Sequence, residues 1–203
     1  MAYLVGATPF GFLAGKMRGV DIREHGSGNI GATNVLRTLG KPIGITVLIL
    51  DILKGVTPVL VARLVSEGLD HQSLLMILTA VAAIMGHNYT FWLGFKGGKG
   101  IATTAGAMIP VIPIAILVAV VLWVSALLTT RYVSVASIVA AISIPLTLVA
   151  KFILSGTWDF AILGFALFIS LLAIWKHRSN IDRLRRGEEN RFGTKKSSHS
   201  QPH

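Results

Sequence analysis

Residues 101–130 read IATTAGAMIPVIPIAILVAVVLWVSALLTT, an apolar stretch without a single charged side chain. A helix needs about 20 mainly apolar residues to cross a bilayer, so this stretch is longer than one span. It also lacks the alternation of apolar and polar residues that marks the strand of a membrane barrel. The stretch therefore indicates a helical membrane protein.

The composition of the whole chain supports this fold class. Of 203 residues, 53% are hydrophobic and only 14% are charged, and the mean hydropathy is +0.68. A soluble domain would have roughly a quarter of its residues charged. The chain has no cysteine, which excludes disulfides, a thiol nucleophile and thiolate metal sites, and we expect neither a metal nor a cofactor.

Five further apolar runs define the remaining segments, at residues 1–15, 42–65, 73–92, 133–154 and 158–175. The first run lacks the charged start and the cleavage site of a signal peptide, so we interpret it as a helix. Proline disfavours a helix at and before itself, and Pro110 and Pro113 therefore predict a turn within residues 101–130. Two helices there, the first one short, give seven transmembrane segments.

The basic residues predict the orientation of these segments. The net charge is +10, and 16 of the 19 lysines and arginines fall in four connections, at residues 16–41, 93–100, 131 and 176–203. Basic connections concentrate on the cytoplasmic side, and two passes within residues 101–130 place all four there. We therefore expect an all-α polytopic membrane bundle with its N-terminus outside and its C-terminus in the cytoplasm.

The sequence indicates one domain. Residues 1–192 are expected to form a single membrane-embedded unit, and residues 193–203 a polar, disordered tail. The chain is already polar from Gly187 onward, so we expect little order beyond that point. The basic excess itself fits three kinds of partner, which are nucleic acid, anionic lipid headgroups and anionic substrates.

The first polar stretch reads DIREHGSGNIGATNVLRTLG, at residues 21–40. Glycine lets a backbone approach a ligand closely, small hydroxyl and amide groups hydrogen-bond oxyanions, and arginine offers a planar fork suited to phosphate. An ordinary connecting loop would use the glycines for turns alone, but the combination favours an anion site. Its candidate ligands are Ser27, Gly28, Asn29, Thr33, Asn34 and Arg37.

The second polar stretch, GHNYTFWLGFKGGKG at residues 86–100, directly precedes a predicted helix. Glycines and lysines before a helix start bring backbone N–H groups and ammonium charge together, as a phosphate cradle requires. The spacing differs from that of the nucleotide P-loop. A flexible interfacial loop with snorkelling lysines is the alternative. The candidate ligands are Lys96, Gly97, Gly98, Lys99, Gly100 and Thr103.

The third polar stretch follows the last apolar run. His177, Arg178 and Asn180 lie closest to the membrane, where a second anionic group could be held. Arg185 and Arg186 are more typical of an anchor on lipid headgroups. His177 and Asp182 have the spacing of a catalytic His-x4-Asp pair, but five helical residues leave their side chains about 140° apart.

Smaller polar signals lie elsewhere. Ser134 and Ser137 follow Arg131 on the same predicted side of the membrane and are further candidate ligands. Asp51 and Lys54 are charged residues within an apolar run, spaced by three residues so that they share one helix face. This pair is open to two interpretations, a structural ion pair or part of a site.

Taken in order, these motifs resemble the bacterial membrane acyl-phosphate:glycerol-3-phosphate acyltransferases of the PlsY type. The resemblance extends to about Phe192 and is carried by five stretches: GSGNIGATNVLRTLGK at 26–41, GHN at 86–88, GFKGGKG at 94–100, RYVS at 131–134 and HRSNIDR at 177–183. It implies transfer of a fatty acyl group from acyl phosphate to the 1-hydroxyl of glycerol 3-phosphate in the bacterial plasma (inner) membrane, with the active site on the cytoplasmic face. The products are lysophosphatidic acid and inorganic phosphate.

The residues suit direct transfer without an acyl-enzyme. Lys99 and the backbone of residues 97–100 are expected to neutralise the leaving phosphate, while Arg37, Ser27 and Asn29 complete the anion cage. The residues expected to orient glycerol 3-phosphate are Asn180, His177 and Arg178. Either His177 or a substrate phosphate takes the proton. Ser27 is the less favoured nucleophile, because no base can be assigned beside it.

Two other functions fit parts of the sequence. An anion channel or carrier predicts charged residues in the middle of several helices, where essentially only Asp51 and Lys54 qualify. A membrane anchor that binds nucleic acid explains the basic tail but not the glycine-rich loop at residues 26–29. The expected partners are therefore the two phosphorylated substrates and membrane lipids, without nucleic acid, and we expect a monomer.

Overall fold

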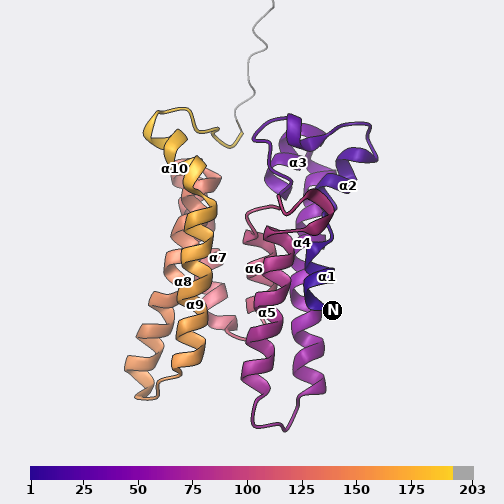
Figure 1. The fold of residues 1–203 in the computed structure, drawn as a ribbon. Coiled ribbons are helices and arrows are strands. Elements are labelled where there is room, and N and C mark those ends of the chain that lie inside the picture. The colour runs from indigo at the N-terminus through magenta and orange to yellow at the C-terminus, as the bar shows by residue number, and fades with distance from the viewer. Residues whose placement is uncertain (194–203) are drawn as a thin grey trace, which may run out of the picture.

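The computed structural model describes residues 1–193, which form helices and loops without a strand (Figure 1). The helices in chain order are α1 (Ala2–Ala7), α2 (Phe10–Lys16), η1 (Ile22–Glu24), α3 (Ala32–Leu39), α4 (Lys41–Val65), α5 (Gln72–Asn88), η2 (Phe91–Leu93), α6 (Ile101–Met108), α7 (Pro113–Thr130), α8 (Val133–Ser155), α9 (Phe160–Lys176) and α10 (Arg178–Arg185). The expected all-α class is confirmed. Residues 194–203 of the expected tail lie outside the described residues.

Several of these helices are long enough to cross a membrane. Within residues 1–193, the helices α4, α7 and α8 and the segment Gln72–Leu93, which joins α5 to η2, are sufficiently long and apolar. A fifth candidate combines α9 and α10, which are bent by 50°. Two other apolar segments form the short helices α1 and α6, of six and eight residues. The fold is thus a helical membrane bundle with four to five candidate spans.

The short helices pack closely against long neighbours through glycine. A side chain at Gly6 of α1 would collide with the carbonyl group of Ala83 in α5. In the same way, a side chain at Gly106 of α6 would collide with the carbonyl group of Ile52 in α4. Small residues allow such close packing where no hydrophobic effect drives helices together in lipid.

The first apolar run is broken, which corrects the expectation of one helix over residues 1–15. Pro9 has no N–H group and disfavours a helical Thr8, so α1 ends before it and α2 begins after it. Buried donors satisfy the freed carbonyl groups. Thr90 donates to the oxygen of Ala7 at 2.6 Å, and Lys54 Nζ donates to that of Thr8 at 2.8 Å.

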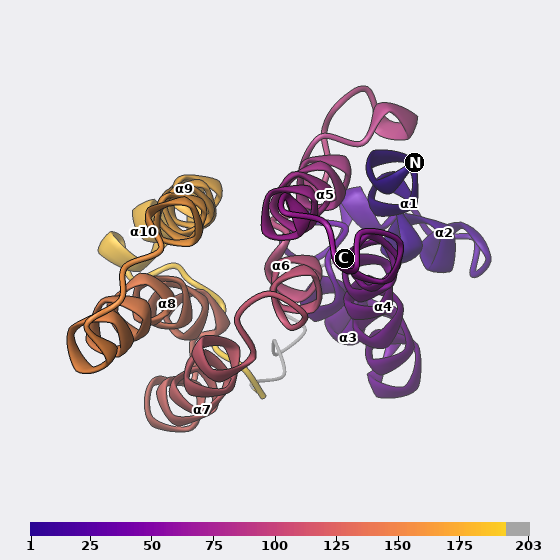
Figure 2. The same ribbon diagram turned by 90° about the horizontal axis from the view of Figure 1, so that it is seen from below.

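The predicted turn near Pro110 is confirmed, because α6 ends at Met108 and α7 begins at Pro113. The helices on either side of this turn belong to two groups that stand side by side (Figures 1 and 2). The first group contains α1 to α6 and the second α7 to α10. A buried apolar cluster with members such as Ile84, Met108 and Phe165 joins the groups.

The polar stretches meet at one end of the bundle, which we call the polar end. Figure 1 shows α2, α3 and α10 there, at the top of the view. The glycine-rich loop of residues 94–100 enters α6 from this side. Segments that are far apart in the sequence therefore meet between the two groups of helices.

Candidate active site

A cavity of about 560 Å³ extends from the polar end into the bundle, between α4 and α6 on one side and α7 and α8 on the other. Eleven of the predicted site residues line it: Ser27, Asn29, Thr33, Asn34, Arg37, Lys99, Gly100, Ser134, Ser137, His177 and Asn180. Most of the wall further from the polar end is apolar, with residues such as Ala119, Ala140 and Ile144. The cavity thus joins a polar, cationic head to an apolar groove.

The backbone of residues 97–100 packs directly on the end of α5. A side chain at Gly97 would collide with the carbonyl group of His87, and one at Gly98 with the His87 ring. The Gly98 N–H group donates to the His87 carbonyl oxygen at 3.1 Å. Because Gly97 and Gly98 face α5 and are absent from the described cavity lining, their visible role is to fix the position of Lys99.

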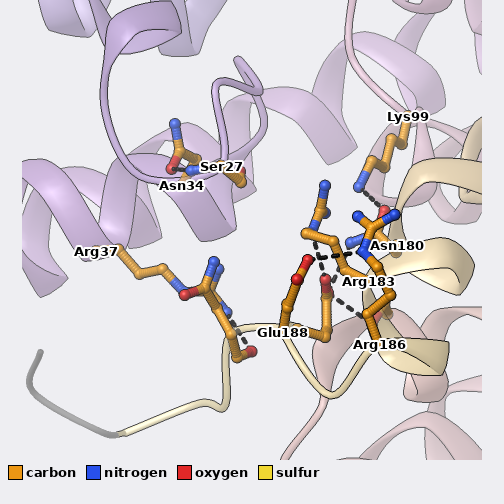
Figure 3. A network of polar contacts seen from close by, with 11 residues as sticks. Ser27, Asn34, Arg37, Lys99, Asn180, Arg183, Arg186 and Glu188 are labelled. Atoms are coloured by element: carbon orange, nitrogen blue, oxygen red, sulfur yellow. Dashed lines mark hydrogen bonds and ion pairs between the residues drawn. The ribbon is translucent and has the colours of Figure 1, made fainter.

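Lys99 begins a chain of hydrogen bonds that crosses the cavity head (Figure 3). Its ammonium group donates to Asn180 Oδ1, and Asn180 Nδ2 donates to Glu189 Oε1 at 2.7 Å. Ser134 Oγ donates to the same carboxylate oxygen at 2.8 Å. Arg183 Nε binds the other oxygen, Oε2, at 2.8 Å. A carboxylate thereby sits among cationic and hydrogen-bonding groups.

Burial changes the proton affinity of both ends of this chain. It lowers the pKa of Lys99 to about 8, although the nearby Glu189 carboxylate opposes the change. Burial alone would raise the pKa of Glu189, but hydrogen bonds from Asn180, Ser134 and Arg183 more than offset it, so that the pKa is lowered. Glu189 is therefore ionised near neutral pH, while Lys99 has a proton that it can lose in mildly alkaline solution.

Residues 187–193 make specific contacts with the rest of the protein, whereas their polar composition predicts little order. The segment folds back over the cavity head, where Arg37 Nη2 donates to the Asn190 carbonyl oxygen at 3.2 Å. The Phe192 N–H group donates to the Arg131 carbonyl oxygen at 2.6 Å. Partly buried hydrogen bonds to Glu189 explain why so polar a segment is held in place.

Asn34, a predicted phosphate ligand that lines the cavity, is also hydrogen-bonded within its own loop. Its side chain is 2% exposed and its amide group binds the loop that precedes it. Asn34 Oδ1 accepts from the Ser27 N–H group at 2.8 Å, and Nδ2 lies within 3.0 Å of the carbonyl oxygens of Ile22, His25 and Asn29. With its amide engaged, Asn34 shapes the loop that presents Ser27 and Asn29 to the cavity.

His177 lies at the bend between α9 and α10 and is 3% exposed. Its Nδ1 atom is 2.7 Å from the Ala173 carbonyl oxygen, which can only accept a hydrogen bond. We therefore assign the proton to Nδ1, and Nε2 then carries a free lone pair. A residue on the cavity wall with such a lone pair is able to accept a proton from a bound hydroxyl group.

Six predicted ligands are not part of the described cavity lining: Gly28, Lys96, Gly97, Gly98, Thr103 and Arg178. Thr103 is fully buried, and its carbonyl oxygen contacts Gly55 of α4. The Arg178 guanidinium instead stacks on the Trp175 ring at 4.2 Å. Neither residue therefore contributes to the cavity lining, and the exposed Lys96 does not contribute either.

The residues at or beside the cavity that were not predicted ligands include four titratable ones: Asp51, His87, Arg183 and Glu189. Asp51 forms an ion pair with Lys54 at 2.7 Å, one of the two interpretations of this pair, and His87 Nδ1 lies 3.8 Å from the same carboxylate oxygen. The acidic pair Glu188-Glu189 within a basic stretch was the one available signal for Glu189. His87 lies in the second polar stretch and in the GHN motif at 86–88, but it was not chosen as a ligand, and the fold brings it to this wall at the end of α5.

The fold and the cavity define the class of protein. Membrane-spanning helices surround a cavity with Lys99 and Arg37 at its polar head and an apolar groove below. Such a cavity fits an amphipathic molecule with an anionic head and a hydrocarbon tail. The chain is therefore an integral membrane protein with a site suited to lipid phosphates.

Comparison with known proteins gives the family. Residues 1–187 match the family described as glycerol-3-phosphate acyltransferase. The chain belongs to this family and is a membrane-embedded acyltransferase.

Individual relatives agree with this assignment. The glycerol-3-phosphate acyltransferase of Desulforudis audaxviator is 47% identical over 199 residues, covering 97% of this chain and 94% of the relative. That of Geobacter sulfurreducens is 47% identical over 192 residues, covering 95% and 94%. A crystal structure of PlsY, an integral membrane glycerol 3-phosphate acyltransferase in its glycerol 3-phosphate form, is 43% identical with a TM-score of 0.84, covering 95% of this chain and 92% of that one. Its lysophosphatidic acid form has a TM-score of 0.81 at 42% identity, with the same coverage.

Proposed function

We propose that the protein transfers a fatty acyl group from acyl phosphate to the 1-hydroxyl of glycerol 3-phosphate, giving lysophosphatidic acid and inorganic phosphate. The observation that carries this proposal is a cavity in which a cationic head continues into an apolar groove. Each substrate brings a phosphate to the head, and the acyl chain extends into the groove. The relatives' crystal forms with glycerol 3-phosphate and lysophosphatidic acid support the choice of acceptor and product.

The cationic groups at the head bind the phosphates. The ammonium group of Lys99 binds the phosphate that leaves the acyl carbon, together with N–H groups at Gly100 and the start of α6. Arg37 and the loop of Ser27 and Asn29 complete this cage from α3. Asn180 holds glycerol 3-phosphate beside His177 on the opposite wall. These assignments need the Lys99–Asn180 contact to open or to be shared when substrate enters.

The transfer is a direct substitution at the acyl carbon. The 1-hydroxyl oxygen attacks the carbonyl carbon, the bond from that carbon to the phosphate oxygen breaks, and phosphate leaves. The hydroxyl proton goes either to His177 Nε2 or to a substrate phosphate oxygen. Since acyl phosphate is already activated, the residues position the two substrates and neutralise charge, which are the larger contributions in reactions of this kind.

We also propose a single membrane-embedded domain over residues 1–192 that acts as a monomer in the bacterial plasma membrane. Its seven segments are α1 with α2, then α4, α5, α6, α7, α8 and α9. The N-terminus faces the outside and the polar end faces the cytoplasm, because the basic connections gather at the polar end. The short helices α1 and α6 cross only part of the bilayer, at 1.5 Å per residue.

The test supplies purified protein in detergent with glycerol 3-phosphate and one of three donors, which are acyl phosphate, acyl-CoA and acyl carrier protein thioester. The proposal predicts lysophosphatidic acid and one equivalent of phosphate from acyl phosphate, and little product from either thioester. Equal use of acyl-CoA would overturn the assignment of the donor. Protein eluting with bound DNA or conducting anions in vesicles would point to the other two functions.

A further inference from the structure

The apolar groove has a defined end. The Trp123 indole N–H group of α7 donates to Ser137 Oγ of α8 at 3.3 Å, which fixes how these antiparallel helices align. Seven residues further from the polar end on each helix lie Ile116 and Ile144, about 10 Å deeper. Both line the cavity, and they are 5% and 6% exposed. They therefore face each other at one level of the groove.

A third isoleucine completes this level. Ser170 Oγ of α9 donates to the Ala141 carbonyl oxygen of α8 at 2.7 Å, which brings the neighbouring Ile169 beside Ile144. Ile169 is 2% exposed and also lines the cavity. We call Ile116, Ile144 and Ile169 the isoleucine layer.

A second cavity of about 370 Å³ lies beyond the isoleucine layer, at the end of the bundle away from the polar end. Ala115 and Leu148 line it, next to Ile116 in sequence and one helical turn beyond Ile144. Among residues 1–193, none lines both cavities. The isoleucine layer thus separates two spaces along the same axis of the bundle.

The depth of the groove matches one leaflet of a membrane. Ser134 marks the polar head, and Ile144 lies ten residues further along α8, about 15 Å away. The hydrocarbon core of a bilayer is about 30 Å thick, so each leaflet holds chains about 15 Å long. Alanines at positions 119, 140 and 141 keep the space above the layer open.

We propose that the isoleucine layer is the end wall of the acyl-chain site and sets the longest acyl chain that the enzyme uses efficiently. This inference rests on the proposed function, since it takes the groove to hold the acyl chain. A chain that reaches past the layer must push side chains out of a closely packed core, which is unfavourable. A shorter chain fits without that penalty.

Two variants, one double and one single, move the end wall in opposite directions. Ile116→Ala with Ile144→Ala opens the layer toward the second cavity, so longer donors gain relative to shorter ones. Ala119→Leu moves the end wall toward the polar head by about one helical turn, which corresponds to about four carbons of an extended acyl chain. We expect it to lower the use of long donors relative to short ones by about fivefold or more, the effect of a moderate overpacking cost.

The assay measures kcat/KM over a series of saturated acyl phosphates with purified protein in one detergent. Each value is divided by that of the unsubstituted enzyme at the same chain length, because partition of the donor into micelles then cancels. The control is Ile142→Ala, which makes the same change on α8 at a side chain 44% exposed on the outside of the bundle. It should leave the chain-length profile unchanged.

The outcomes separate this inference from the proposed function. A chain-length profile displaced in opposite directions in the double variant and in Ala119→Leu supports the end wall. If the unsubstituted enzyme uses acyl phosphates but every variant has the same relative profile, the end wall is wrong and the proposed function stands. If no acyl phosphate is used at any length, the proposed function itself fails. A uniform loss of kcat/KM at all chain lengths, together with lowered thermal stability, would show that the isoleucine layer is needed for folding. It would overturn the role of the layer in chain selection.

Discussion

Raising the pH should lower kcat/KM, because Lys99 of the free enzyme loses its positive charge. Its pKa of about 8 lies well below that of an ordinary lysine because the side chain is buried. Below that pH the ammonium group is charged and binds phosphate. Above it the charge is lost, so kcat/KM should fall about tenfold for each pH unit beyond the pKa. Bound phosphate stabilises the ammonium form, so the corresponding fall in kcat should occur at a higher pH.

The assay measures initial rates of lysophosphatidic acid formation from pH 6 to 10, with the non-enzymatic hydrolysis of acyl phosphate subtracted. Lys99→Arg is the matched control, because arginine keeps its charge throughout this range. This variant should be slower at neutral pH but should lack the alkaline fall. A flat profile for the unsubstituted enzyme, or the same fall in Lys99→Arg, would refute the assignment of this titration to Lys99.

Substitutions at three further places test the site and its surroundings. Gly98→Ala forces the loop away from the His87 ring and thereby displaces Lys99. A displacement of about 1 Å should lower kcat/KM on the order of a hundredfold. A near-normal kcat/KM would contradict the packing argument. Asn34→Asp keeps an acceptor for the Ser27 N–H group but loses the donors to three carbonyl oxygens, so it should lower the free energy of unfolding by about 2–4 kcal/mol, and we expect the same of Asn34→Ala. An unchanged melting temperature would rule out a role of Asn34 in shaping the loop. The double variant Arg185→Ala with Arg186→Ala should bind anionic lipid more weakly. Its turnover in detergent should be nearly unchanged, because neither residue lines the cavity. A large loss of turnover would overturn the anchor interpretation.

The sequence was sufficient for the fold class and for most of the cavity head. Continuous apolar runs and Pro110 predicted a helical bundle with a break inside residues 101–130, and the structure has both. The proline rule that located this break applies equally at Pro9, where one helix had been expected. Polar motifs with phosphate-binding chemistry predicted Arg37, Lys99 and Asn180, which line one cavity although they lie far apart in the chain.

Other features depend on tertiary contacts that no local pattern reveals. The glycines at positions 97 and 98 have the composition of a phosphate cradle, but their closest neighbour is the end of α5. Asn34 has the chemistry of an anion ligand, and only the folded loop shows that its amide is already engaged. Glu189 lies in a segment whose composition is typical of disorder, and three hydrogen-bonding partners from α8 and α10 hold it in place.

The most direct test of the account replaces Lys99 with alanine and measures lysophosphatidic acid formation from acyl phosphate and glycerol 3-phosphate. The variant should melt in detergent close to the temperature of the unsubstituted enzyme, which shows that it is folded. The account predicts a loss of turnover of at least about a hundredfold, because a buried cation that neutralises the leaving phosphate is removed. Near-normal turnover by the folded variant would contradict the claim that the polar head of this cavity carries out the transfer.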